Sequence, residues 1–176
     1  MKALQIRRSV TKFGMARIAS AVAPATAAKI GPLELRSIDD PACPGEGWHR
    51  VRTRLAGICG SDLHLYEPLG AFMNEGDVLG HEAMSVVEEV GPDVSVIAPG
   101  DRVVVPFQVC CGTCWMCEHG LPSQCETTQV REQGMGAALF GYSELYGSVP
   151  GGQAEYLRIP QAQFTHVKVP DGPPDS

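Results

Sequence analysis

The stretch CCGTCWMCEHGLPSQC, residues 110–125, holds five of the seven cysteines in the chain. Four thiolates are the ligand set of a closed, tetrahedral zinc site, and short C-x2-C turns aim two sulfurs at one point. Such a site leaves no position open for a substrate, so it is structural rather than catalytic. The spacing therefore predicts a structural zinc lobe with four ligands: Cys111, Cys114, Cys117 and Cys125.

Other uses of these cysteines fit the sequence less well. Cys110 begins a C-x3-C spacing and is interpreted as a bystander. The seven cysteines are odd in number and clustered, unlike those of a disulfide framework. A zinc knuckle that binds nucleic acid would carry cations, whereas this stretch and its flank carry Glu118 and Glu126 and no Lys or Arg.

The overall composition restricts the class of protein. A chain of 176 residues is long enough for one domain with a sizeable core, and its 20 Gly and 14 Pro indicate many turns. The net charge is −6, and nothing in that balance favours nucleic acid or an anionic membrane surface as a partner. No apolar run approaches the roughly 20 residues of a membrane span. We therefore expect neither nucleic acid nor a membrane as a partner.

Short strands dominate the pattern along the chain. Residues 57–66 are expected to leave a strand and enter a short helix, with Ser61 or Asp62 as its cap. No long amphipathic helix is predicted. The pattern favours a mainly β fold, a partly open β-barrel with a few short helices. Apolar and β-branched runs bounded by Gly and Pro predict strands at residues 1–6, 33–38, 51–55, 83–90, 102–105 and 153–159.

Two segments near the ends of the chain stand apart from this pattern. Residues 7–31 form an insertion between the first two strands, and its Arg7-Arg8 pair and Ala-rich run have the look of a twin-arginine export signal. Because the run is mostly Ala and is broken by a proline, we favour a surface insertion in a cytoplasmic protein, where thiolates stay reduced. Residues 171–176 have the composition of a linker that follows a domain of residues 1–170.

A second metal centre is predicted from two separate segments. A lone cysteine or histidine is more often a core residue than a ligand, but here both are surrounded by polar side chains. Cys59 lies in GICGSDLH, and His81 lies in GHE beside Glu82. A thiolate, an imidazole and one further ligand leave a fourth position open, which is the arrangement of a catalytic zinc. A hydroxyl, a carboxylate and an imidazole follow Cys59 within five residues: Ser61, Asp62 and His64.

Together these motifs resemble the N-terminal catalytic domain of the zinc-dependent alcohol dehydrogenases, in the medium-chain dehydrogenase/reductase superfamily. The resemblance covers most of residues 48–170 in the same order and implies a GroES-like β-barrel fold. Residues 139–160 are further similar to the branch that includes glutathione-independent formaldehyde dehydrogenases. The matching motifs are GICGSDLH at 57–64, GHE at 80–82, GDRV at 100–103, the four-cysteine lobe, and GGQAEY at 151–156.

The resemblance implies a metal-binding role for several residues of the second centre. Cys59 and His81 match ligands of the catalytic zinc. Glu82 matches a carboxylate that lies beside the metal and can ligate it. Asp62 matches a partner of the zinc-bound imidazole, a type of residue that orients the ligand.

Two further residues match the proton relay of the family. Ser61 matches the hydroxyl that takes the proton of the alcohol, and His64 matches the relay residue toward solvent. The resemblance implies one structural and one catalytic Zn²⁺, with NAD or NADP as the hydride acceptor. It also implies a small alcohol or aldehyde as substrate and a homo-oligomer as the assembly.

Three departures from the family pattern affect the expected function. Ser85 stands where the family usually has Gly, and residues 7–31 exceed the usual hairpin. The third protein ligand of the catalytic zinc and the NAD(P)-binding Rossmann domain are expected beyond Ser176. The segment GMGAALFG, residues 134–141, lacks the glycine spacing and the βαβ setting of a dinucleotide loop. We therefore expect a catalytic-domain portion that is inactive alone; the alternative is a standalone zinc-binding structural or interaction module.

Overall fold

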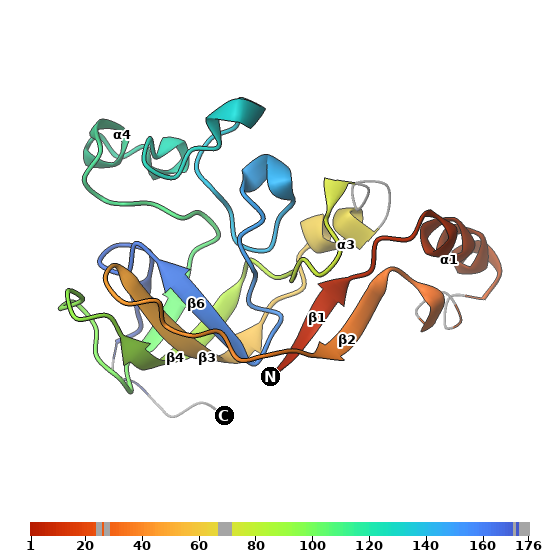
Figure 1. Cartoon of the computed structure of the whole chain (residues 1–176), viewed down its shortest axis with the longest axis horizontal. Helices are drawn as coiled ribbons and strands as arrows, with labels where there is room; N and C mark the ends of the chain where they lie inside the picture. The colour runs from red at the N-terminus through yellow and green to blue at the C-terminus, as the bar shows by residue number, and fades with distance from the viewer. Residues whose placement is uncertain (24–25, 27–28, 67–71, 171, 173–176) are drawn as a thin grey trace.

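The framework of the computed structural model is a pair of antiparallel sheets (Figure 1). One sheet pairs β1 with β2, and the other has the strand order β6-β3-β4-β5-β7. The structure describes residues 1–23, 26, 29–66, 72–170 and 172. The strands are β1 (Lys2–Ile6), β2 (Leu33–Ser37), β3 (Trp48–Ala56), β4 (Ala83–Val90), β5 (Arg102–Val105), β6 (Tyr156–Pro160) and β7 (Val167–Lys168).

Helical segments are short and lie in the connections between strands. Within the described part of the chain, no helix combines the length and apolar character needed to cross a membrane. The helices whose full range is described are α1 (Val10–Val22), α3 (Gly60–Tyr66) and α4 (Trp115–Glu118), together with the 3-10 helices η2 (Pro122–Gln124), η3 (Arg131–Gln133) and η4 (Glu144–Tyr146).

The main core lies against the larger sheet. Successive side chains of a strand point to opposite faces, and in β4 buried and less buried residues alternate over most of its length. Strands that are neighbours in the sheet send their inward residues to one apolar cluster, which contains Val51 of β3, Val87 of β4, Val103 of β5 and Ile159 of β6. The alternation therefore explains both the strands and the core that they share.

The prediction of a mainly β fold is confirmed, although the strand boundaries differ. Among the described strands β6 and β7 are the edges of the larger sheet, so the sheet is open and does not close into a barrel. The strand predicted at 51–55 is longer and starts at Trp48, because its first residues pair with β4 and β6. The strand predicted at 153–159 begins only at Tyr156. The two-residue strand β7 was not predicted, since two residues show no alternation.

The predicted cap of the helix at residues 57–66 is wrong in position. Helix α3 begins at Gly60, so Ser61 and Asp62 lie inside its first turn rather than before it. The Oδ2 atom of Asp62 accepts a hydrogen bond of 2.9 Å from the backbone N–H of Cys59. The carboxylate therefore stabilises the helix start from within the first turn, as the acidic residue of a capping box does.

The insertion at residues 7–31 contains α1. The hydroxyl of Ser9 accepts a hydrogen bond of 3.3 Å from the backbone N–H of Lys12 and caps this helix. Strands β1 and β2 pair across the insertion, with Ile6 opposite Leu33. Figure 1 shows α1 at one end of the long axis of the molecule, beyond the small sheet and away from the larger one.

Candidate metal centres

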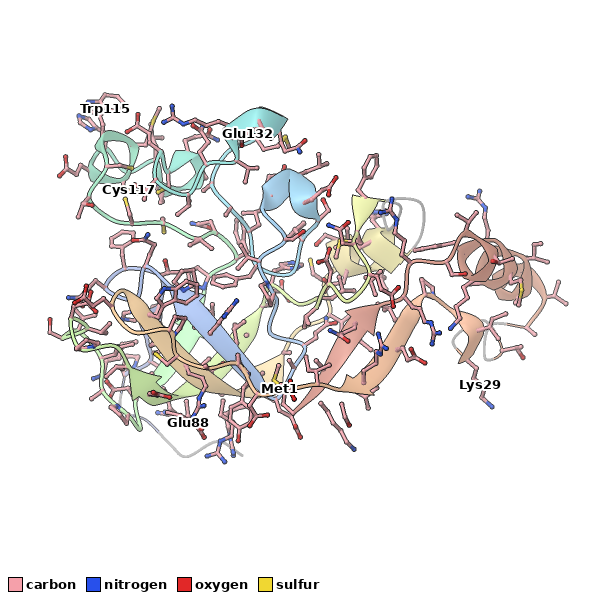
Figure 2. The ribbon with its side chains drawn as sticks, viewed as in Figure 1. Met1, Lys29, Glu88, Trp115, Cys117 and Glu132 are labelled. Atoms are coloured by element: carbon pink, nitrogen blue, oxygen red, sulfur yellow. The ribbon has the colours of Figure 1, made fainter. Side chains whose placement is uncertain are left out.

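The four-cysteine lobe forms the first centre. Its sulfur atoms all lie within 4.8 Å of one another. The Sγ of Cys125 lies 3.7 Å from the Sγ of Cys111 and 3.9 Å from that of Cys114. Sulfurs that each lie about 2.3 Å from a tetrahedral zinc are about 3.8 Å apart, so the spacing fits this ion. Figure 2 shows Cys117 in this lobe together with Trp115, apart from the sheets.

Tight backbone turns position these sulfurs. Gly112 has a φ of +77°, and a Cβ at this position would lie 2.5 Å from the ring of Phe164. Glycine is therefore required both by the left-handed backbone and by the close approach of the ring. Cys114 is the N-cap of α4, which carries Cys117, and the 3-10 helix η2 ends directly before Cys125.

Hydrogen bonds favour the thiolate form of Cys111 in this lobe. The Sγ of Cys111 accepts hydrogen bonds from the hydroxyl of Thr127 at 3.2 Å and from the backbone N–H of Cys114 at 3.3 Å. Burial raises the pKa of Cys111, but these bonds and those from Thr113 outweigh it and lower the pKa to about 5. Burial, with the neighbouring lobe cysteines, raises the pKa of Cys110 to about 11, so this residue stays a neutral thiol.

The second centre lies where β3 ends and β4 begins. These strands are antiparallel neighbours, with Ala56 of β3 opposite Ala83 of β4. The segment that leaves β3 therefore lies beside the segment that enters β4. Here the structure brings together Cys59, His81 and Glu82, whose ligand atoms lie within 4.8 Å of one another.

Asp62 is buried between the two segments. Its Oδ2 accepts the hydrogen bond from Cys59 and another of 3.4 Å from the Nε2 of Gln153. Its Oδ1 lies 3.3 Å from the Nδ1 of His81, although the two atoms lack the alignment of a hydrogen bond. A carboxylate beside Nδ1 favours a proton on that nitrogen, which leaves Nε2 available for a metal.

The hydroxyl of Ser61 lies beside that available nitrogen. Its Oγ is 3.2 Å from the Nε2 of His81. The phenol of Tyr142 donates a hydrogen bond of 3.1 Å to the same Oγ, and its ring centre is 5.0 Å from that of His81. A hydroxyl is thus held next to the nitrogen that is available for a metal.

The remaining predicted residues are less closely tied to the centre. His64 is exposed on α3 and makes no hydrogen bond or ion pair with any described residue. The side chain of Glu82 is exposed and packs over Gly57, where a Cβ would overlap its carboxylate. The absence of a side chain at Gly57 therefore makes room for the third candidate ligand.

A family model described as the alcohol dehydrogenase GroES-like domain matches residues 45–171. This range covers both candidate centres and the whole larger sheet. The chain belongs to this family. The predicted resemblance and the GroES-like fold are thereby confirmed, while residues 7–31 lie outside the matched range.

Relatives of this GroES-like domain chain are zinc-type alcohol dehydrogenases. An uncharacterized zinc-type alcohol dehydrogenase-like protein, AdhB, of Bacillus subtilis is 44% identical over 78% of this chain and 36% of its own length. A glutathione-independent formaldehyde dehydrogenase of the same organism is 38% identical over 81% of this chain and 35% of its own. The chain thus spans about a third of each relative.

A solved structure shows the same fold. The alcohol dehydrogenase TADH from Thermus sp. ATN1 has a TM-score of 0.75 and 31% sequence identity to this GroES-like domain chain. The comparison covers 97% of this chain and 40% of the other. The family assignment therefore rests on sequence and on three-dimensional structure.

Two residues that hold the second centre of this GroES-like domain together were not predicted. Tyr142 contacts Ser61, and Gln153 contacts Asp62. Neither side chain is a zinc ligand, and each is far in sequence from its partner, so spacing gives no direct signal. The available signals were the motif GGQAEY, which contains Gln153, and the stretch 139–160, which contains both residues and carries the resemblance to formaldehyde dehydrogenases.

Ser85, the departure from the family pattern, is accommodated in β4. It is fully buried opposite Thr53 of β3. The hydroxyl groups of both residues have no hydrogen-bond partner among the described residues. The close packing of the strands is thus retained at the cost of two unpaired polar atoms.

Proposed function

We propose that this chain forms the alcohol-binding, zinc-binding portion of an NAD(P)-linked alcohol or aldehyde dehydrogenase. The observation that carries the proposal is the arrangement at the second centre, where Cys59, His81 and Glu82 converge beside the hydroxyl of Ser61. Family membership supports the same chemistry, because the relatives are alcohol and formaldehyde dehydrogenases.

The donor set of this centre fits a catalytic zinc. Thiolate sulfur, imidazole nitrogen and carboxylate oxygen are all zinc ligands, and three of them leave one position open. Asp62 orients the imidazole of His81, and it also holds the backbone of Cys59 at the start of α3 by a hydrogen bond. Bound zinc would polarise the oxygen of an alcohol and lower its pKa, and a nicotinamide would accept hydride.

The side chains of the protein are proposed to transfer the proton of the alcohol. Ser61 is placed to relay the proton of the alcohol, because its Oγ lies beside the His81 nitrogen that would bind the metal: the Oγ takes that proton as its own hydroxyl proton is released toward solvent. The hydrogen bond from Tyr142 occupies one lone pair of that Oγ and leaves the other for the incoming proton. His64 is exposed and is proposed to pass the proton to solvent.

The four-cysteine lobe is proposed to hold a second zinc that stabilises the fold. All four protein ligands are present there, so no position is open to a substrate. We further propose that the whole protein is a cytoplasmic homo-oligomer, in which zinc thiolates stay reduced.

Kinetic measurements on the product of the complete coding region that contains these residues test the proposal. NAD(P)H formation from short alcohols and formaldehyde is expected, and Ser61→Ala should lower kcat about a hundredfold or more. Cys59→Ser should abolish activity together with zinc at the second centre. Cys43→Ser is the matched control and should leave activity unchanged, because this thiol belongs to neither candidate metal centre and donates a hydrogen bond to the carbonyl of Trp48.

The 176 residues alone are expected to give no NAD(P)H. Both sheets are antiparallel, so the described residues hold no βαβ unit that could bind a dinucleotide, and hydride transfer requires a positioned nicotinamide. Turnover by this chain that depends on Cys59 would show that the cofactor binds here and would overturn the proposal of a separate nucleotide-binding part.

A further inference from the structure

The charges of this acidic chain are unevenly distributed. Residues 1–33 contain six of the 14 Lys and Arg and none of the 20 Asp and Glu. The remaining residues therefore carry eight cations against all 20 carboxylates. The expectation of no membrane partner rested on the overall net charge of −6, which conceals a cationic N-terminal segment attached to an acidic body. Five of these six cations form no ion pair with any described residue, among them the exposed Arg8, Arg17 and Lys29.

This cationic segment contains a helix whose outward face is apolar. In α1 only Ala16 is buried. Met15, Ile18 and Val22 are 49%, 72% and 82% exposed, and their spacing of three and four residues places them in one row along the helix. Helices on a protein surface normally turn their apolar side inward, whereas α1 carries an additional apolar row on its exposed side.

Cations flank the apolar row. At 100° per residue, Lys12 and Arg17 fall on opposite sides of it, roughly 90° and 130° away from its centre. Figure 1 shows α1 at the end of the molecule, and Figure 2 shows Lys29 at the same end. The surface that the molecule presents at this end is therefore an apolar strip bordered by positive charge.

We propose that α1, with Arg8, Arg17 and Lys29, docks this chain on an anionic phospholipid surface. Ile18 and Val22 enter the headgroup region, and the cations bind lipid phosphates. The acidic body is repelled by the same surface, so the molecule is oriented with α1 toward the lipid. This inference is independent of the dehydrogenase proposal, because it uses none of the residues of the two metal centres.

The size of the strip favours lipid over a second copy of the chain. A helix of 13 residues is about 20 Å long, and a strip about 10 Å wide on it covers about 200 Å². A stable protein interface buries about 800 Å² on each partner, so this strip is too small to hold one by itself. Nucleic acid would use the cations but would leave the apolar row exposed to water.

Vesicle binding by the chain tests the proposal. Vesicles of equal parts phosphatidylcholine and phosphatidylglycerol should bind the chain at least about tenfold more tightly than pure phosphatidylcholine, and added salt should weaken binding. Ile18→Asp and Arg17→Gln should each weaken binding to the anionic vesicles about tenfold or more. Val96→Asp is the matched control, because Val96 is 49% exposed between β4 and β5, and this substitution should have little effect.

Several results would overturn the proposal. Equal binding to both vesicle types would show that the cations do not contribute to lipid binding. Equal effects of Ile18→Asp and Val96→Asp would show that α1 is not the docking element. Binding of duplex DNA that survives Ile18→Asp, with no vesicle binding, would identify nucleic acid as the partner. Self-association that Ile18→Asp abolishes would identify a second copy. Circular dichroism shows whether each variant is folded. The comparison of lipids and salt concentrations uses the wild-type chain and is therefore independent of misfolding in a variant.

Discussion

Asp62 joins the two segments that supply the second metal centre. One carboxylate oxygen accepts the backbone N–H of Cys59, and the other lies beside the Nδ1 of His81. Asp62→Asn keeps the shape of the side chain but removes its charge and one acceptor. We expect the zinc affinity of this centre to fall about 10- to 100-fold, because residues that orient ligands have effects of this size.

Competition with a chelator measures this affinity, and the four-cysteine lobe serves as an internal control in the same sample. The lobe should keep its zinc in Asp62→Asn. An unchanged affinity at the second centre would mean that Asp62 does not orient the imidazole of His81.

The unpaired hydroxyl of Ser85 leads to a prediction about stability. Its hydroxyl is fully buried and has no hydrogen-bond partner among the described residues. Ser85→Ala removes that unpaired group with little change in volume, and we expect the free energy of unfolding to rise by about 1 kcal/mol. Urea denaturation provides the measurement. A loss of stability would show that the hydroxyl has a partner, such as a buried water.

The four-cysteine lobe is the element in which we expect a bound metal to affect folding most. Cys114 supplies one of its four sulfurs, whereas the buried thiol of Cys110 is not part of the group. Metal binding adds to folding free energy because the unfolded chain has no preformed site. Cys114→Ser should therefore destabilise the zinc-loaded chain by at least about 2 kcal/mol, and Cys110→Ser by less than about 1 kcal/mol.

Thermal unfolding and zinc content of these two variants should be measured together. Equal zinc retention in Cys114→Ser and Cys110→Ser would show that the ligands of the lobe are assigned incorrectly.

Local sequence was sufficient for some elements and insufficient for others. Contiguous patterns define β1, β2, β4 and β5, and the bounds of each strand lie within a residue of the prediction. A contiguous pattern also defines the group of four lobe cysteines, which the structure brings together as predicted. The first residues of β3 and the two of β7 depend on pairing with distant strands. Tyr142 and Gln153 were missed for the same reason, since only the tertiary fold brings them to Ser61 and Asp62.

The core of the whole molecule contains a pH-sensitive residue. His49 is fully buried, and neither of its ring nitrogens has a hydrogen-bond partner among the described residues. Burial, and then the nearby His166, lower the pKa of His49 from 6.5 to about 4. Its ring lies 5.7 Å from that of His166, centre to centre.

Stability should consequently fall with acid between pH 6.5 and pH 4. In this range the unfolded chain binds a proton at His49 and the folded chain does not, so protonation favours unfolding. Above pH 6.5, His49 is neutral in both states and does not lower the free energy of unfolding. By pH 4, its protonation in the unfolded chain lowers that free energy by up to about 3 kcal/mol. Urea denaturation of the wild type and His49→Val across this range isolates the effect from other titrating groups. Parallel pH dependence in the two proteins would refute it.

The central claim concerns the whole molecule: one chain with two zinc centres of different completeness. The most direct measurement is the zinc content of the zinc-loaded chain during stepwise chelation, followed by native mass spectrometry. We predict that a first ion, bound in substoichiometric amount and absent from Cys59→Ser, leaves at a low chelator concentration. A second ion, lost in Cys114→Ser, should remain until the chelator is much stronger, because four cysteines enclose it. Two ions that resist the chelator equally, or a single ion unaffected by Cys114→Ser, would contradict the account.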